Sequence, residues 1–175
     1  MYYGEIKVCD IANGIGVRVS LFVSGCRNCC KNCFNKMTWS FNYGKEFNDE
    51  TMNYLLANLS NDYIDGLTIL GGEPLEKENQ AEVLKIIKKV REVFPNKSIW
   101  LYTGFTYDEL TIDNTCRANT PLINDILANI DVLVDGRFIE EEKDICLHFR
   151  GSRNQRIIDV KKTLKNNKLT ILEAL

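Results

Sequence analysis

The stretch from Val17 to Asn35 reads VRVSLFVSGCRNCCKNCFN, and it joins the two patterns that decide the fold. Residues 17–24 are rich in β-branched and large apolar side chains and are followed by Gly25, which predicts a strand. Four cysteines then fall within eight residues, at positions 26, 29, 30 and 33. The strand therefore leads directly into a cysteine-rich loop.

Outward from this stretch, apolar strands alternate with amphipathic helices. Apolar spacing predicts helices over residues 49–59, 79–94 and 122–129, and strands over 67–70, 98–102, 130–134 and 156–160. This alternation predicts an α/β fold with a mostly parallel sheet, in a single domain spanning 1–175. A full eight-unit β/α barrel needs about 250 residues, so a chain of 175 residues leaves room only for a partial one.

Four predicted strands end in turns that contain glycine or polar residues. These turns are Gly25-Cys26, GlyGlyGluPro at 71–74, Thr103-Gly104 and Asp135-Gly136. In parallel α/β sheets, ligands bind beyond the carboxyl ends of the strands. We therefore expect all four turns on one rim, around a binding site.

Composition excludes several classes of function. With 22 basic and 24 acidic side chains the net charge is −2, so a broadly basic nucleic-acid binder is excluded. Because no apolar run reaches 18 residues and no signal peptide precedes the first strand, we expect no membrane contact and a cytoplasmic location. The seven cysteines are an odd number, which argues against a disulfide framework.

The cysteine loop contains two overlapping three-cysteine spacings. Cys26, Cys30 and Cys33 form C-x3-C-x2-C, whereas using Cys29 in place of Cys30 gives C-x2-C-x3-C. Thiolates suit zinc or iron–sulfur clusters, and the adjacent Cys29 and Cys30 cannot easily face one ion together. Three thiolates on a four-iron cluster leave one iron open to a small molecule. From spacing alone, a non-catalytic zinc module and a thiol redox pair remain alternatives.

The C-x3-C-x2-C spacing resembles the cluster motif of the radical S-adenosylmethionine (SAM) enzymes. Within that superfamily, the chain resembles the activating proteins of anaerobic ribonucleoside-triphosphate reductase. The matching stretches cover nearly the whole chain: Asn13-Gly14 with Gly16 and Arg18, LFVSGC at 21–26, CFNK at 33–36 with Thr38-Trp39, GGEP at 71–74, WLYTG at 100–104, VLVDGRF at 132–138 and RGSRNQ at 150–155.

The resemblance implies a partial (β/α)6 radical SAM barrel. It assigns a [4Fe-4S] cluster to Cys26, Cys30 and Cys33 and leaves Cys29 as a bystander. It also implies that SAM binds beside the cluster, with its methionine amino group held by the GlyGlyGlu turn. Most of the superfamily has an aromatic residue just before the third cysteine, whereas here that position is Asn32 and the aromatic residue follows the cysteine. The residues expected to contact SAM are Asn32, Phe34, Gly71, Gly72, Glu73, Thr103 and Asp135.

The implied reaction is a reductive cleavage of SAM. One electron from the reduced cluster breaks the C5′–S bond, and the resulting 5′-deoxyadenosyl radical removes a hydrogen atom from a glycine of the anaerobic reductase. The family suggests flavodoxin as the electron donor. Alternatives within the superfamily are a pyruvate formate-lyase-type activase and a deazapurine-synthesis enzyme.

The end of the chain is basic. From residue 147 onward there are seven basic and two acidic side chains. This excess predicts a mobile basic tail over residues 161–175, which could also dock an acidic partner.

Overall fold

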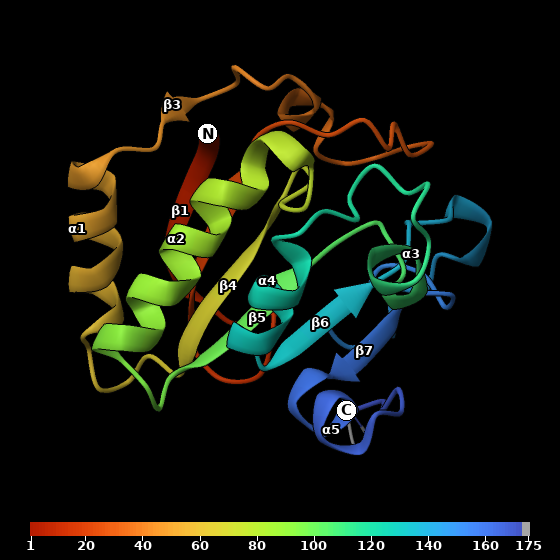
Figure 1. The fold of residues 1–175 in the computed structure, drawn as a ribbon. Coiled ribbons are helices and arrows are strands. Elements are labelled where there is room, and N and C mark those ends of the chain that lie inside the picture. Colours follow the sequence, from red (N-terminus) through yellow and green to blue (C-terminus); the bar gives the residue numbers. More distant parts are fainter. Residues whose placement is uncertain (173–175) are drawn as a thin grey trace.

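The computed structural model describes residues 1–172, and Figure 1 shows its ribbon. Within these residues seven strands form one mixed sheet, in the order β3-β1-β2-β4-β5-β6-β7. The strands are β1 (Tyr2–Asp10), β2 (Arg18–Val23), β3 (Lys45–Glu46), β4 (Gly66–Gly71), β5 (Ser98–Tyr102), β6 (Val132–Asp135) and β7 (Arg156–Asp159). The helices are η1 (Lys36–Trp39), α1 (Asp49–Leu59), α2 (Lys77–Val93), α3 (Tyr107–Thr111), α4 (Ile123–Asn129), η2 (Glu140–Glu142) and α5 (Val160–Asn166).

The centre of the sheet is parallel, as predicted. Strands β2, β4, β5 and β6 are successive neighbours and pair in parallel, whereas β1, β3 and β7 pair antiparallel. The carboxyl ends of the four parallel strands therefore lie at the same edge. That edge carries the four turns expected on one rim.

The six β/α units of the expected barrel are not confirmed. Only three strand pairings are parallel within the described residues, and β3 and β7 stand at the two ends of an open sheet. A parallel connection needs a crossover, usually an α-helix. Between β6 and β7 the chain forms only the short helix η2, and β7 returns antiparallel to β6.

Helices α2 and α4 stand in front of the sheet in Figure 1, and α1 stands beside it at the left of the view. Helix α2 follows the predicted spacing and ends just before Pro95. Its inner face and the strand residues beneath it form the main core, which includes Val19, Leu21, Leu67, Ile69, Val83, Ile86, Ile87 and Val90. None of the helices described is long and apolar enough to cross a membrane.

The opposite face of the sheet is covered by a loop instead of a helix. Trp100, Val134 and Ile157 form a second cluster there, against which Tyr102 and Phe149 pack. Phe149 belongs to the connection between β6 and β7. A hollow can therefore form between this connection and the sheet.

The segment expected as a mobile basic tail, residues 161–175, continues the fold as far as the structure describes it. Its first residues lie in α5, and Ile171 forms an isolated β-bridge with Ile158 of β7. Residues 173–175 lie outside the described residues.

Candidate functional site

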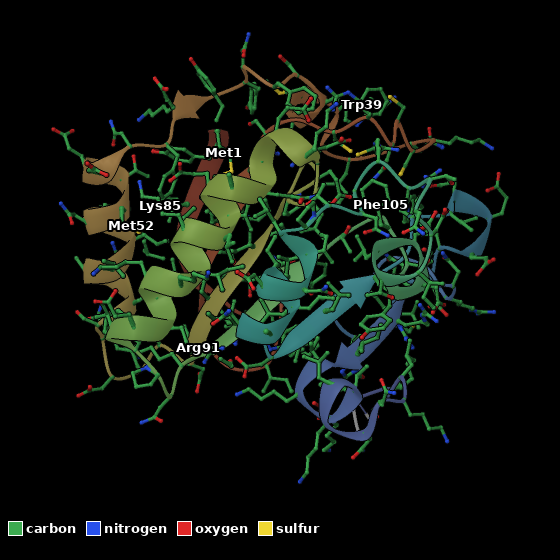
Figure 2. All side chains as sticks on the ribbon, in the orientation of Figure 1. Met1, Trp39, Met52, Lys85, Arg91 and Phe105 are labelled. Carbon is green, nitrogen blue, oxygen red and sulfur yellow. The ribbon has the colours of Figure 1, made fainter. Side chains whose placement is uncertain are left out.

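A cavity of about 470 Å³ lies at the carboxyl ends of the central strands. Its lining comes from the β1–β2 loop, the cysteine loop, the turns after β4 and β5, and the β6–β7 connection. Figure 2 shows Trp39, which lines the cavity, at this end of the molecule and Arg91 near the opposite end. The volume lies within the range of roughly 300–1,000 Å³ that is typical of small-molecule sites.

The structure brings together the three cysteines of the C-x3-C-x2-C spacing. Cys26, Cys30 and Cys33 all line the cavity. Cys29 is exposed, lies outside the lining and takes a left-handed backbone conformation with φ +47°. The fold thus separates Cys29 from the other three thiols of the loop.

These three thiols line one cavity, and thiolates are the donors that iron–sulfur clusters use. Within residues 1–172, no group of three or more His, Cys, Asp or Glu side chains is arranged to hold one ion. A structural zinc site needs four donors around one point, whereas a four-iron cluster is wider and accepts thiolates that lie farther apart.

Burial changes the acidity of these thiols. It raises the pKa of Cys26 to about 12 and also raises the pKa of Cys30. Both thiols are therefore protonated near neutral pH when no metal is bound. A cluster bound through these thiols would therefore release their protons.

The turn after β4 holds backbone close to the cysteine loop. Gly71 has φ +111°, and a Cβ atom there would lie 2.7 Å from the backbone nitrogen of Val23. The N–H groups of Gly72 and Glu73 donate to the carbonyls of Val23 and Gly25, each at 2.8 Å. Gly71 and Gly72 both line the cavity, and their lack of a side chain allows this turn to pack directly against the backbone of β2 and of the cysteine loop.

Glu73 is buried and accepts four hydrogen bonds. Its Oε1 accepts from the Leu75 N–H at 3.0 Å and from Thr103 Oγ1 at 2.8 Å. Its Oε2 accepts from the Gly104 N–H at 2.7 Å and from Asn28 Nδ2 at 3.0 Å. Burial raises the pKa of Glu73 to about 7. Its carboxyl group thus joins the β4 turn to the end of β5 and to the cysteine loop.

Most of the other residues expected to contact SAM also reach the cavity. Asn32, Phe34 and Thr103 line it, and the Phe34 side chain is 96% exposed.

Asp135 is the exception among the described residues, because it lies outside the lining. It is buried, and its carboxylate accepts from the Arg156 Nε at 2.9 Å and from the Tyr107 N–H at 2.7 Å. In this structure the Asp135 carboxylate forms an ion pair between β6 and β7 and does not face the cavity.

Comparison with known proteins identifies the family. Residues 12–158 match a protein family that is described as a 4Fe-4S single cluster domain. A protein from Vibrio cholerae is 41% identical over 159 residues, which cover 90% of this chain and 97% of that protein. Proteins from Escherichia coli K12 (38% over 157 residues, 89% and 96% covered) and phage T4 (37% over 157 residues, 90% and 93% covered) are similar as well. All three are named anaerobic ribonucleoside-triphosphate reductase-activating protein.

The chain belongs to this family of activating proteins. The region of this chain that the family matches contains every cavity-lining residue from Ala12 to Gln155. The description of the matching family names an iron–sulfur cluster, as the family resemblance implies; the cysteine spacing alone left zinc open as well.

One wall of the site cannot be located from the ends of the predicted strands. The β6–β7 connection contributes Phe138, Lys143, Phe149 and Arg150 to the lining. The only sequence signals for this wall are the GRF and RGSRNQ stretches of the family resemblance, because the connection has neither apolar periodicity nor a strand end.

Proposed function

We propose that this chain is a radical SAM activase. A [4Fe-4S] cluster on Cys26, Cys30 and Cys33 would serve the reductive cleavage of SAM, and the product radical would form the glycyl radical of anaerobic ribonucleoside-triphosphate reductase. The observation that carries the proposal is that these three cysteines and the Gly71-Gly72 turn line one cavity. The relatives' names support the reductase as the protein target.

When bound, the cluster supplies one electron to the sulfonium group of SAM. The chain's own residues bind and orient the reactants and exclude water. Gly71 and Gly72 offer backbone atoms to the amino-acid end of SAM, and Asn32, Phe34 and Thr103 offer contacts to its nucleoside. Apolar lining residues such as Phe22 and Leu70 keep water away from the reacting bond.

A radical reaction requires no protein acid or base, and the cavity agrees with that. Its two acidic lining residues are already engaged within the part of the chain that the structure describes. Glu73 accepts four protein hydrogen bonds, and Asp144 pairs with Arg153 at 3.0 Å. Positioning is therefore the main contribution of this site.

The first test is anaerobic iron and sulfide analysis, with electron paramagnetic resonance (EPR) after dithionite reduction, with and without SAM. We expect about four irons per chain and a reduced-cluster signal that changes when SAM is added. The Cys30→Ala variant should lose the cluster, whereas Cys29→Ala should keep it. A single zinc, or a signal indifferent to SAM, would overturn the proposal.

The second test adds the reductase and a reductant such as flavodoxin, the donor that we propose. A glycyl doublet in the EPR spectrum of the reductase is the expected result. A reduced cluster that cleaves SAM without this doublet would redirect the proposal to another radical SAM reaction.

A further inference from the structure

The residue after the first cysteine is held by a buried carboxylate. Glu76 lies at the start of α2, and its side chain is 0% exposed. It accepts from the backbone N–H of Arg27 at 2.9 Å and from the Arg27 guanidinium, also at 2.9 Å. The guanidinium lies over the ring of Phe41, 4.3 Å from its centroid. Arg27 is thereby fixed through both its backbone and its side chain.

A second arginine extends this arrangement to the next residue of the loop. Arg117 lies between β5 and α4 and donates to Glu76 through Nε at 3.2 Å and Nη2 at 3.1 Å. Its Nη2 also donates to the side-chain oxygen of Asn28 at 2.7 Å, and Asn28 in turn donates to Glu73. We call Arg27, Asn28, Glu73, Glu76 and Arg117 the Glu76 clamp.

The other end of the cysteine loop is held much more weakly. The stretch 29–32 makes no backbone hydrogen bond to another element among the described residues. Its ion pair, Lys31 with Glu141 at 2.8 Å, joins side chains that are 70% and 67% exposed. Exposed pairs of this kind contribute little to stability. Cys29 and Asn32 both have left-handed backbone conformations.

We infer that Glu76 is a positioning residue, which preforms the Cys26 end of the loop before the cluster binds. The Cys30–Cys33 end then adapts to the cluster. The planar guanidinium groups of the clamp fix geometry through paired hydrogen bonds to one carboxylate. Asn28 also lines the cavity, so the clamp orders one wall of the site as well as one ligand. This inference rests on the proposed function in one respect, because it takes the cysteine loop as the site where the cluster binds.

The first experiment measures amide hydrogen exchange by NMR in the cluster-free protein under reducing, anaerobic conditions. In the wild type, the amides of Cys26 and Arg27 should exchange at least tenfold more slowly than those of Lys31 and Asn32. Glu76→Gln should remove most of this difference at Arg27, whose N–H donates to Glu76, because a neutral amide cannot hold both arginines. Equal exchange at the two ends of the wild-type loop, or an unchanged pattern in Glu76→Gln, would overturn the inference.

The matched control is Glu78→Gln. Glu78 contacts the same Arg27 guanidinium at 2.6 Å, but its side chain is 39% exposed. We expect exchange at Arg27 to change less than twofold in this variant. If Glu76→Gln fails to fold, Arg117→Gln tests the clamp from its other side, because Arg117 is 36% exposed, lies outside the loop and donates to both Glu76 and Asn28. Arg117→Lys should keep more protection from amide exchange than Arg117→Gln but less than the wild type, because lysine lacks the planar guanidinium group that donates two hydrogen bonds to one carboxylate.

The second experiment measures iron release to a chelator from the reconstituted protein. Glu76→Gln should release iron at least tenfold faster than the wild type, and Glu78→Gln at the wild-type rate. Equal release from Glu76→Gln and the wild type contradicts the positioning role. Neither experiment contains SAM or reductase. Both can therefore test the role of Glu76 even if the protein does not cleave SAM. A failure of cluster binding would appear separately, as missing iron in the wild type.

Discussion

At the scale of single residues, Arg18 shows how a buried charge can be held without a carboxylate. Its side chain is fully buried at the start of β2, and burial lowers its pKa to about 10. All five of its N–H donors are used, and within residues 1–172 it forms no ion pair. The acceptors are Thr68 Oγ1, Ser98 Oγ and the carbonyls of Ile15, Leu67 and Ser98. One side chain thus joins β2, β4 and β5.

We expect Arg18→Met to lower the free energy of unfolding by about 2–4 kcal/mol, because buried carbonyls lose their donors. Urea denaturation of the cluster-free protein measures this change. Arg153→Gln is the control, because Arg153 is 72% exposed and its pair with Asp144 should contribute less than about 0.5 kcal/mol. Similar losses in the two variants would show that the network of Arg18 contributes little.

Glu73 gives a pH-dependent prediction. Its pKa is about 7 in the folded protein, against an ordinary value of 4.5, because burial penalises the charged form. The folded state therefore binds this proton more tightly, so the stabilisation is present below pH 4.5 and is lost as pH rises through 7. Relative to the wild type, Glu73→Gln should gain on the order of 1–3 kcal/mol of stability between pH 5 and pH 8. Urea denaturation across that range measures the difference, and parallel pH profiles would contradict the shift.

At the scale of elements, the end of β4 depends on close contact with β2. Gly71→Ala should lower the free energy of unfolding by at least about 3 kcal/mol, because a Cβ would meet the backbone of Val23 at 2.7 Å in addition to the strain of a positive φ. Gly136 is a matched control. It has φ +94°, but the atom nearest to its added Cβ lies 3.6 Å away, so Gly136→Ala should cost only about 1–2 kcal/mol of strain. Thermal and urea unfolding compare the two, and equal costs would contradict the role of the contact.

Elements with a strong pattern could be predicted from the sequence. Helix α1 spans the predicted residues 49–59, and β5 spans the predicted 98–102. The sequence does not predict strand β1, because its side chains are mostly half-buried or exposed and include Glu5 and Lys7, so it lacks the apolar pattern of a strand. Helix α3 has five residues, too few to show a helical period. Such elements are determined by their neighbours more than by their own sequence.

At the scale of the whole molecule, the parts of the site that can be predicted from the sequence are those that follow parallel neighbouring strands. The parallel order of β2, β4 and β5 brings the cysteine loop and the GlyGlyGlu turn to one edge. By contrast, the contact of Arg117 with Glu76 spans 41 positions and follows no period. The turn of Asp135 toward Arg156 likewise depends on β7 returning antiparallel, which an alternating pattern does not reveal.

Removal of the cluster should affect one end of the molecule only. We expect chelation to lower Tm by on the order of 10 °C, because a cluster that binds only the folded chain stabilises it. Amide exchange should increase in the cysteine loop and in residues 137–151, whereas α2 should remain protected. Anaerobic calorimetry and exchange of the holo and chelated protein measure both effects. An unchanged Tm would show that the cluster contributes nothing to stability.

The distribution of the cavity lining along the chain has a consequence for biosynthesis. The lining begins at Ala12 and is complete only with Gln155. The wall formed by the β6–β7 connection is therefore translated after the other walls of the cavity. Residues 12–155 must therefore all have left the ribosome before the cavity can close. The cysteines precede this wall by more than 100 residues in the sequence. They are therefore translated well before the wall that covers them, and they stay exposed to solvent until it is made. A cluster enclosed by this cavity would therefore be sheltered only after residue 155 has been translated, and the unfinished chain would be the form most in need of a reducing environment.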